Sequence, residues 1–262
     1  MTPALAPSYA SVTEHPGQPA SRIQLEILGA RYAWAAEQAR GKDVLEVACG
    51  AGLGLPILAE AARSVHAGDV DAENLRSAAE ARAEHRNITL REFDAEDLPF
   101  PHESFDLALL FEAIYYLPDV RRFFGEAHRV LRPGGTLLIV TVNPQWTGFN
   151  PSPFNTRYWT SKELLAALRV AGFMARVEGA FPETNSWAAS AVGLIRRAAV
   201  ALNLIPRTMD GKALLKRIFC GPLAKIPRHV NASSLRPRLD DLDTAGSRHH
   251  RVLYVTARKI NA

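Results

Sequence analysis

The sequence contains few cysteines and no long uninterrupted apolar run. Its two cysteines, Cys49 and Cys220, are too few for a disulfide framework, which predicts a reducing compartment. No run of about 18 uncharged apolar residues occurs, and the first residues show neither the basic nor the apolar region of a signal peptide. We therefore expect a cytoplasmic protein without a transmembrane segment.

The chain also lacks an even distribution of charge. Its 262 residues carry a formal net charge of +4, yet residues 190–230 contain eight Lys or Arg and a single acid, Asp210. That segment therefore carries +7 and the rest of the chain −3. A basic protein invites a nucleic-acid interpretation, but here the basic character belongs to one late segment.

Short apolar or β-branched runs alternate with helical stretches through the first part of the chain. The runs cover residues 44–48, 64–70, 88–94, 105–111 and 136–142, and the helical stretches cover 21–40, 55–63, 72–85 and 120–130. This alternation predicts an α/β fold, a Rossmann-like doubly wound sheet that is mostly parallel and binds ligands at the carboxyl ends of its strands. After a helix at 161–171, the runs at 174–181 and 251–258 are expected to form an antiparallel edge pair.

These patterns divide the chain into four predicted regions. They are an N-terminal lid and helix (1–40), the Rossmann-like core (41–181), a basic helical insertion (182–248) and a final strand of the core (249–262). The insertion is expected to form a cap on the substrate side of the sheet, because its apolar residues have helical spacing.

A carboxylate, Glu46, stands in the apolar run of DVLEVACGAGLGL, directly before a glycine-rich turn. A buried charge is costly unless a partner compensates it. Glycines after a strand let a nucleotide approach the backbone, but the dinucleotide pattern G-x-G-x-x-G is not met, because the sixth position from Gly50 is Leu55. The negative charge of Glu46 would repel a pyrophosphate and suits a ligand that carries positive charge.

The pattern E-x-A-C-G-x-G, with Glu46, Ala48, Gly50 and Gly52, resembles the first motif of class I S-adenosylmethionine-dependent methyltransferases. The resemblance covers residues 21–181 and implies S-adenosylmethionine as the cofactor, with no metal. It implies that Glu46 faces the cationic amino-acid end of the cofactor, directly or through water. The alternative is a carboxylate that accepts hydrogen bonds from backbone amides of the loop.

The segment VHAGDVDAENL resembles the part of the family that follows its second strand. The resemblance implies that Asp69 accepts hydrogen bonds from the two ribose hydroxyls, which a carboxylate can do at once. Asp71 is the competing choice for that role. Val70 would then pack against the adenine.

The segment FDAEDLPFPHESFDLALL resembles the family between its third and fourth strands. The resemblance implies that Asp94 accepts from the adenine amino group, that Ala95 supplies a backbone amide, and that Phe111 lines the cofactor pocket. The alternative for Asp94 is an ordinary turn residue.

The acceptor of the methyl group is expected at FEAIYYLPDV, after the fourth strand. We predict Glu112 as a base or acceptor-orienting carboxylate and Tyr116 as a pocket wall or hydrogen-bond donor. The alternative is a helix-start charge at Glu112 and packing roles for Tyr115 and Tyr116. His15, carried by a lid, is a further possible base.

The resemblance implies transfer of a methyl group to an oxygen or nitrogen of a small molecule or glycan. Amino-methyltransferases of nucleic acids carry [DNS]-P-P-[YFW] after the fourth strand, where this chain has Leu110-Phe111-Glu112-Ala113; Asn143-Pro144-Gln145-Trp146 follows the fifth strand and lacks the second proline. This argues against methylation of bases. The alternatives are an RNA methyltransferase that binds through residues 190–230, or a non-catalytic S-adenosylmethionine-binding regulator.

The basic insertion has two further interpretations besides a helical cap. It could contact an anionic acceptor, such as a nucleotide sugar or lipid-linked glycan, or it could contact a membrane surface or a partner protein. The sequence does not determine the oligomeric state.

Overall fold

The computed structural model describes residue 9 and residues 12–152, 154–183, 222–230, 236–242 and 246–260. The elements are, in chain order, β1 (Pro19–Ser21), α1 (Arg22–Ala39), β2 (Asp43–Val47), α2 (Leu55–Ala61), β3 (Ser64–Asp69), α3 (Ala72–Glu84), β4 (Ile88–Glu92), β5 (Phe105–Phe111), the 3-10 helix η2 (Ile114–Tyr116), α4 (Val120–Val130), β6 (Leu131–Val142), α5 (Ser161–Val170), β7 (Phe173–Pro182), β8 (Leu223–Lys225), β9 (Asp240–Asp241) and β10 (His250–Lys259).

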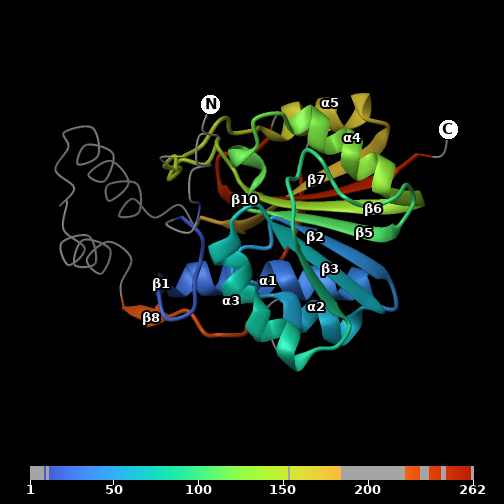
Figure 1. The fold of residues 1–262 in the computed structure, drawn as a ribbon. Coiled ribbons are helices and arrows are strands. Elements are labelled where there is room, and N and C mark those ends of the chain that lie inside the picture. The colour runs from blue at the N-terminus through green and yellow to red at the C-terminus, as the bar shows by residue number, and fades with distance from the viewer. Residues whose placement is uncertain are drawn as a thin grey trace, which may run out of the picture.

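The main sheet has the strand order β4-β3-β2-β5-β6-β10-β7-β9 (Figure 1). Its first five strands are parallel, and β10 is antiparallel to both β6 and β7. The predicted α/β fold class is therefore confirmed, and the antiparallel pair of β7 and β10 is present. This pair lies toward one edge of the sheet, where β10 joins it to β6 and the two-residue strand β9 pairs with β7.

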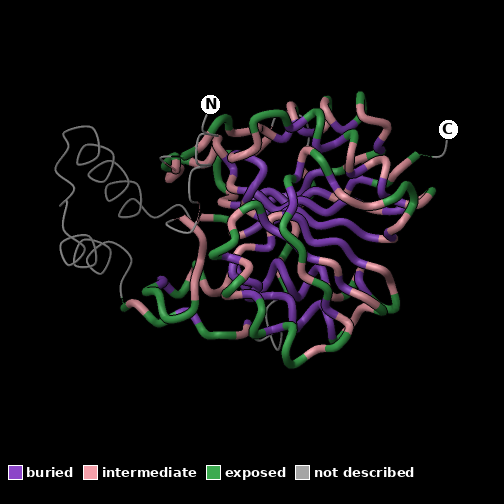
Figure 2. The backbone as a smooth tube through the Cα atoms, viewed as in Figure 1, coloured by how far each residue is buried: buried purple, intermediate pink, exposed green. Residues whose placement is uncertain are grey.

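Helices cover both faces of the sheet, as Figure 1 shows: α1, α2 and α3 lie on one side, and α4 and α5 on the other. Each layer has its own apolar cluster, with Leu28 of α1 and Leu58 of α2 in one and Phe123 of α4 and Leu164 of α5 in the other. Figure 2 shows the strands between these layers as the most buried part of the chain. This burial on both faces explains why the runs of β5 and of the second half of β6 are almost continuously apolar.

Local signals fix the beginnings of the helices. The side chain of Asp119 accepts from the backbone N–H groups of two residues in the first turn of α4. Thr160 and Glu163 form a reciprocal capping box at α5. Asp71 caps α3 by accepting from the backbone N–H of Glu73 at 2.9 Å. The competing candidate for the ribose acid therefore already has a structural role.

A second, two-stranded sheet joins distant parts of the chain. Strand β1, which follows the N-terminal segment, pairs antiparallel with β8, and the backbone N–H of Gly17 donates to the carbonyl of Ile226 at 2.8 Å. Farther on, Val230 donates to the carbonyl of Leu53 beside the glycine-rich turn at 3.2 Å. The end of the predicted insertion thus returns to the N-terminal segment, while the helices predicted for residues 190–220 lie outside the described residues.

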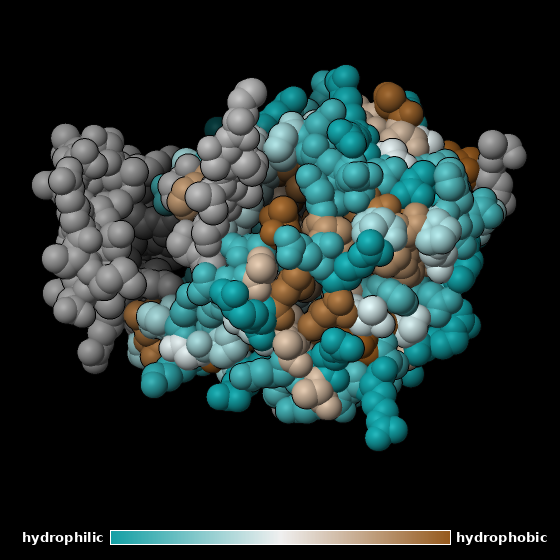
Figure 3. Space-filling model, in the orientation of Figure 1, coloured by the Kyte–Doolittle hydropathy of each residue, from teal (hydrophilic) through white to brown (hydrophobic). Residues whose placement is uncertain are grey.

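The surface seen in Figure 3 is mostly hydrophilic, with apolar side chains gathered near the middle of the face. In the part of the chain that the structure describes, no helix combines the length and apolarity needed to cross a membrane.

Candidate functional site

A cavity of about 930 Å³ lies at the carboxyl ends of the parallel strands. It brings together most of the residues that the sequence predicted for the cofactor, namely Ala48, Gly50, Asp69, Val70, Asp94, Ala95 and Phe111. Glu112 and Tyr116, the residues predicted for the acceptor, line the same cavity. Two predicted residues, Glu46 and Gly52, are not among the residues that line it.

The turn after β2 is shaped by residues with positive φ. Gly50 has φ +55° and Gly52 has φ +71°, a region that side chains rarely adopt, and Ala48 shares it at φ +53°. A Cβ on Gly52 would lie 2.7 Å from the Cβ of Ala78 in α3. The glycines therefore allow both the left-handed backbone and the close approach of α3.

Asp69 ends β3 with its side chain fixed at the edge of the cavity. One carboxylate oxygen accepts from the backbone N–H of Gly50 at 2.9 Å, and the other from the N–H of Asp71 at 2.9 Å and the Nδ2 of Asn74 at 3.3 Å. Burial raises the pKa of Asp69, while these donors lower it. The oxygens of a carboxylate offer about four acceptor positions, so the fixed group can accept further donors from the cavity.

Glu46 is 2% exposed and has a partner that the sequence did not indicate. The hydroxyl of Tyr32, on α1, donates to its Oε1 at 2.7 Å, so the observed donor is a side chain and not the backbone amides of the loop. The Oε2 atom has no hydrogen-bond partner among the described residues. Burial raises the pKa of Glu46 to about 7, against the opposing effect of the Tyr32 hydroxyl.

Glu112 follows β5 directly and has an unusual backbone. Its φ of +51° is rare for a residue with a side chain, and its N–H donates to the carbonyl of Val140 at 2.7 Å. Its Oε2 accepts from the hydroxyl of Tyr115 at 3.1 Å. Burial raises the pKa of Glu112 to about 7, although the positive charge of Arg31 lowers it.

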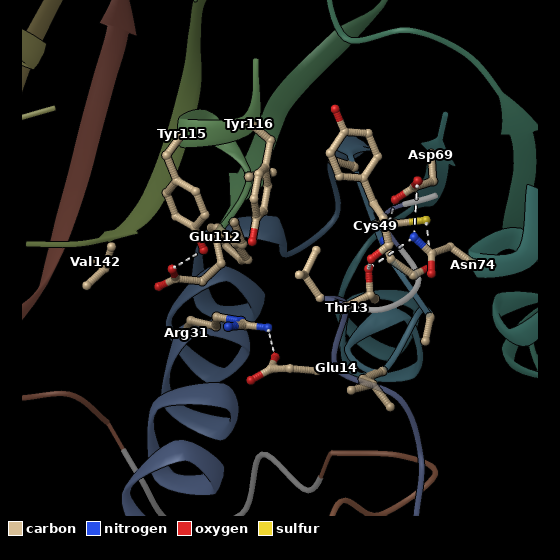
Figure 4. A pocket seen from close by; sticks show the side chains of 18 of the residues that line it. Thr13, Glu14, Arg31, Cys49, Asp69, Asn74, Glu112, Tyr115, Tyr116 and Val142 are labelled. Atoms are coloured by element: carbon tan, nitrogen blue, oxygen red, sulfur yellow. Dashed lines mark hydrogen bonds and ion pairs between the residues drawn. The ribbon is translucent and has the colours of Figure 1, made fainter. Parts of the chain in front are cut away.

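Arg31 and Glu14 belong to the site although no motif indicated them. The Nη2 of Arg31 lies 2.7 Å from the Oε2 of Glu14, and the Arg31 side chain points into the space between Glu14 and Glu112 (Figure 4). Arg31 is 7% exposed, and its Nε has no partner among the described residues. A contact between positions 17 residues apart leaves no local pattern, so sequence reasoning could not find it.

The N-terminal segment forms one side of the cavity. Thr13 accepts from the Nδ2 of Asn74 at 3.2 Å, and the ring of Tyr9 packs on that of Tyr116 with 5.5 Å between centroids. His15 is not among the residues that line the cavity. Its backbone N–H donates to the side chain of Gln18 at 3.2 Å.

Comparison with known proteins shows that the chain is similar to methyltransferases. The family model described as "Methyltransferase domain" matches residues 45–139. Over these residues the chain is similar to the methyltransferase family. A probable S-adenosylmethionine-dependent methyltransferase of Mycolicibacterium smegmatis is 36% identical over 148 residues, which are 54% of this chain and 56% of that protein. The chain spans about half the length of these curated relatives.

Two other similarities extend this result. A phthiotriol/phenolphthiotriol dimycocerosates methyltransferase of Mycobacterium ulcerans is 42% identical over 108 residues, which are 40% of this chain and 39% of that protein. The crystal structure of the cyclase SpnF superposes with a TM-score of 0.61 at 19% identity and covers 98% of both chains. The first is a sequence similarity to a named methyltransferase, whereas the second shows the fold alone.

S-adenosylmethionine is the cofactor of this family, and the cavity has suitable groups for it. Asp69 offers a fixed carboxylate to ribose hydroxyls, and Val70, 44% exposed in the cavity wall, offers an apolar surface. The buried Oε2 of Glu46 and Oδ1 of Asn74 lack partners among the described residues. Unpaired buried acceptors beside a glycine turn suit a ligand that carries N–H and O–H donors.

Proposed function

We propose that the chain transfers a methyl group from S-adenosylmethionine to an oxygen or nitrogen of a small molecule or glycan, with a hydroxyl as the favoured acceptor. The observation that carries the proposal is Glu112, a carboxylate with a raised pKa and a strained backbone in the cavity that also contains Asp69. Strained residues of this kind persist where the surrounding structure holds them, and they cluster at functional sites.

The residues proposed for the cofactor would each contact one part of it. Asp69 would hold the ribose, Val70 and Phe111 would contact the adenine, and Asp94 with Ala95 would pair with its polar edge. The backbone of the turn at Gly50 would border the amino-acid part. When bound, the cofactor supplies an electrophilic methyl group on a sulfonium centre.

Two charged residues would favour the amino-acid end, Arg31 by contact and Glu46 by its negative charge from outside the lining. Arg31 contacts Glu14 through Nη2, but its Nε has no partner among the described residues, and a planar guanidinium suits a carboxylate. Glu46, held by Tyr32, provides the negative charge behind the turn that favours an ammonium or sulfonium.

On the acceptor side, Glu112 would take the proton of the attacking hydroxyl at a carboxylate oxygen. A pKa of about 7 places the group close to neutrality, where a general base works best. Tyr115 donates to Oε2 and fixes the orientation of the carboxylate. The ring of Tyr115 is itself fixed by stacking on Tyr158 with 4.9 Å between centroids.

The name of one relative supports a hydroxyl acceptor. The Mycobacterium ulcerans relative is named a phthiotriol/phenolphthiotriol dimycocerosates methyltransferase, and the ending -triol denotes hydroxyl groups. A larger rate on alcohols and phenols than on amines would support the same acceptor chemistry for this chain.

The test combines Glu112→Gln with a matched control, Glu60→Gln, on the exposed part of α2. Release of S-adenosylhomocysteine is measured with a panel of alcohols, phenols and amines. We expect Glu112→Gln to lower turnover by about 10²–10⁴-fold with cofactor affinity near that of the parent, as for loss of a general base. The rate of the parent should rise with pH and level off above about 7, because the base must be deprotonated. Full activity of Glu112→Gln would remove Glu112 from this role.

A further inference from the structure

The cavity has a second half that the cofactor roles leave unused. Its wall consists of apolar side chains from α1, from the segment at η2, and from the ends of β6 and β10. They are Ile23, Ile27, Leu117, Pro118, Val142 and Val252. In Figure 4, Val142 lies beside Glu112 and Tyr115, at the opposite side of the cavity from Asp69. The candidate base therefore stands at the border of an apolar chamber.

The charges in the described lining disfavour an anionic occupant. Four acids, Glu14, Asp69, Asp94 and Glu112, face two cations, Arg31 and Arg251. An acceptor with a phosphate or carboxylate that entered this cavity would meet a lining with more acids than cations and would lose hydration.

Neither guanidinium group favours an anionic acceptor, because each contacts an acid and Arg31 is assigned to the carboxylate of the cofactor. Arg31 contacts Glu14 at 2.7 Å, and Arg251 contacts Glu183 at 2.8 Å. Arg251 also lies over the ring of Trp146, 4.4 Å from its centroid, and the Nε1 of Trp146 donates to Glu183 at 2.8 Å. Arg251, Trp146 and Glu183 therefore form a fixed part of the wall, in which Glu183 compensates the positive charge of Arg251.

We infer that the acceptor is an uncharged, largely apolar molecule with a hydroxyl group, bound between the apolar wall of α1, β6 and β10 and the carboxylate of Glu112. This inference rests on the proposed function and makes its acceptor more specific. A cavity of about 930 Å³ is near the upper end of the usual range for ligand pockets, roughly 300–1,000 Å³, and has room for a second molecule beside a cofactor. Burial of an apolar body against this wall would supply the affinity, and the hydroxyl would set the orientation.

The test uses the full chain saturated with S-adenosylhomocysteine. Three probes are titrated by calorimetry: 2-naphthol, 2-naphthyl phosphate and glucose. We expect 2-naphthol to bind at least tenfold more tightly than either of the others. Equal or tighter binding of the phosphate ester or of glucose would overturn the inference, as would binding of none of the three probes.

Two variants of the wall, Ile27→Asp and Val142→Asp, provide the second arm. Each variant should weaken the binding of 2-naphthol at least tenfold and change the affinity for S-adenosylhomocysteine less than twofold. Retained binding of S-adenosylhomocysteine also shows that the variant is folded. The matched control is Val170→Asp, because Val170 is 86% exposed on α5 and lies outside the cavity. Unchanged binding of 2-naphthol to a wall variant that retains S-adenosylhomocysteine would contradict the inference alone. Failure of the parent to bind S-adenosylhomocysteine would contradict the proposed function itself.

Discussion

Replacement of Glu46 by glutamine should change how the stability of the protein depends on pH. The carboxyl has a pKa of about 7 in the folded chain, where burial disfavours its charge, against an ordinary value of 4.5. A raised pKa means that the folded chain holds its proton longer than the unfolded chain does. The stability of the parent is therefore full below pH 4.5 and is lost as the pH rises to about 7.

The size of this loss follows from the two pKa values. A difference of about 2.5 corresponds to about 3 kcal/mol, at roughly 1.4 kcal/mol for each pKa unit. Glutamine does not titrate, and its oxygen can still accept from the Tyr32 hydroxyl. The free energy of unfolding of Glu46→Gln minus that of the parent should thus rise by about 3 kcal/mol between pH 4.5 and 8.

Urea unfolding at both pH values measures this difference, because any constant effect of the new amide cancels between them. Glu112 has a raised pKa in the same range, but it is present in both proteins and also cancels. In the matched control, Glu60→Gln, the replaced side chain is exposed. Its difference in free energy of unfolding from the parent should be nearly the same at pH 4.5 and 8. A difference for Glu46→Gln that is the same at pH 4.5 and 8 would refute a buried carboxylate with a raised pKa.

Two further substitutions test the cofactor side of the cavity. Asp69→Ala should weaken S-adenosylmethionine binding by about 1–3 kcal/mol through loss of charge-assisted hydrogen bonds, and an unchanged calorimetric affinity would remove Asp69 from the ribose role. Gly54→Ala should lower the free energy of unfolding by about 1–3 kcal/mol, because a Cβ there would lie 2.0 Å from the ring of Tyr32. Wild-type stability in urea for Gly54→Ala would show that the ring moves aside at no cost.

The sequence contained enough information for the strands and helices of the core and for one end of the site. Strands buried on both faces need continuous apolar runs, and ligands at the ends of parallel strands need a turn and an acid at neighbouring strand ends. Asp69 and the turn at Gly50 are set by such local constraints. They therefore appear together in the cavity as the resemblance implied.

The remaining features depend on contacts between distant residues. The donor to Glu46 is Tyr32, on a preceding helix, and the partner of Arg31 is Glu14, 17 residues away. Neither pair follows from a local pattern, since a helix can present any of several residues to the sheet. The position of β10 inside the sheet has the same origin, because an apolar strand run does not specify its two neighbours.

Strand β10 has a consequence for how the chain folds as it is synthesised. Its residues 250–259 follow every other strand of the main sheet in sequence, yet they bond to β6 on one side and to β7 on the other. Until the ribosome has released this segment, β6 and β7 each present an unpaired edge that could join another nascent chain. Protection of these two edges by chaperones, or rapid closure once residue 259 emerges, would decide the yield of native protein.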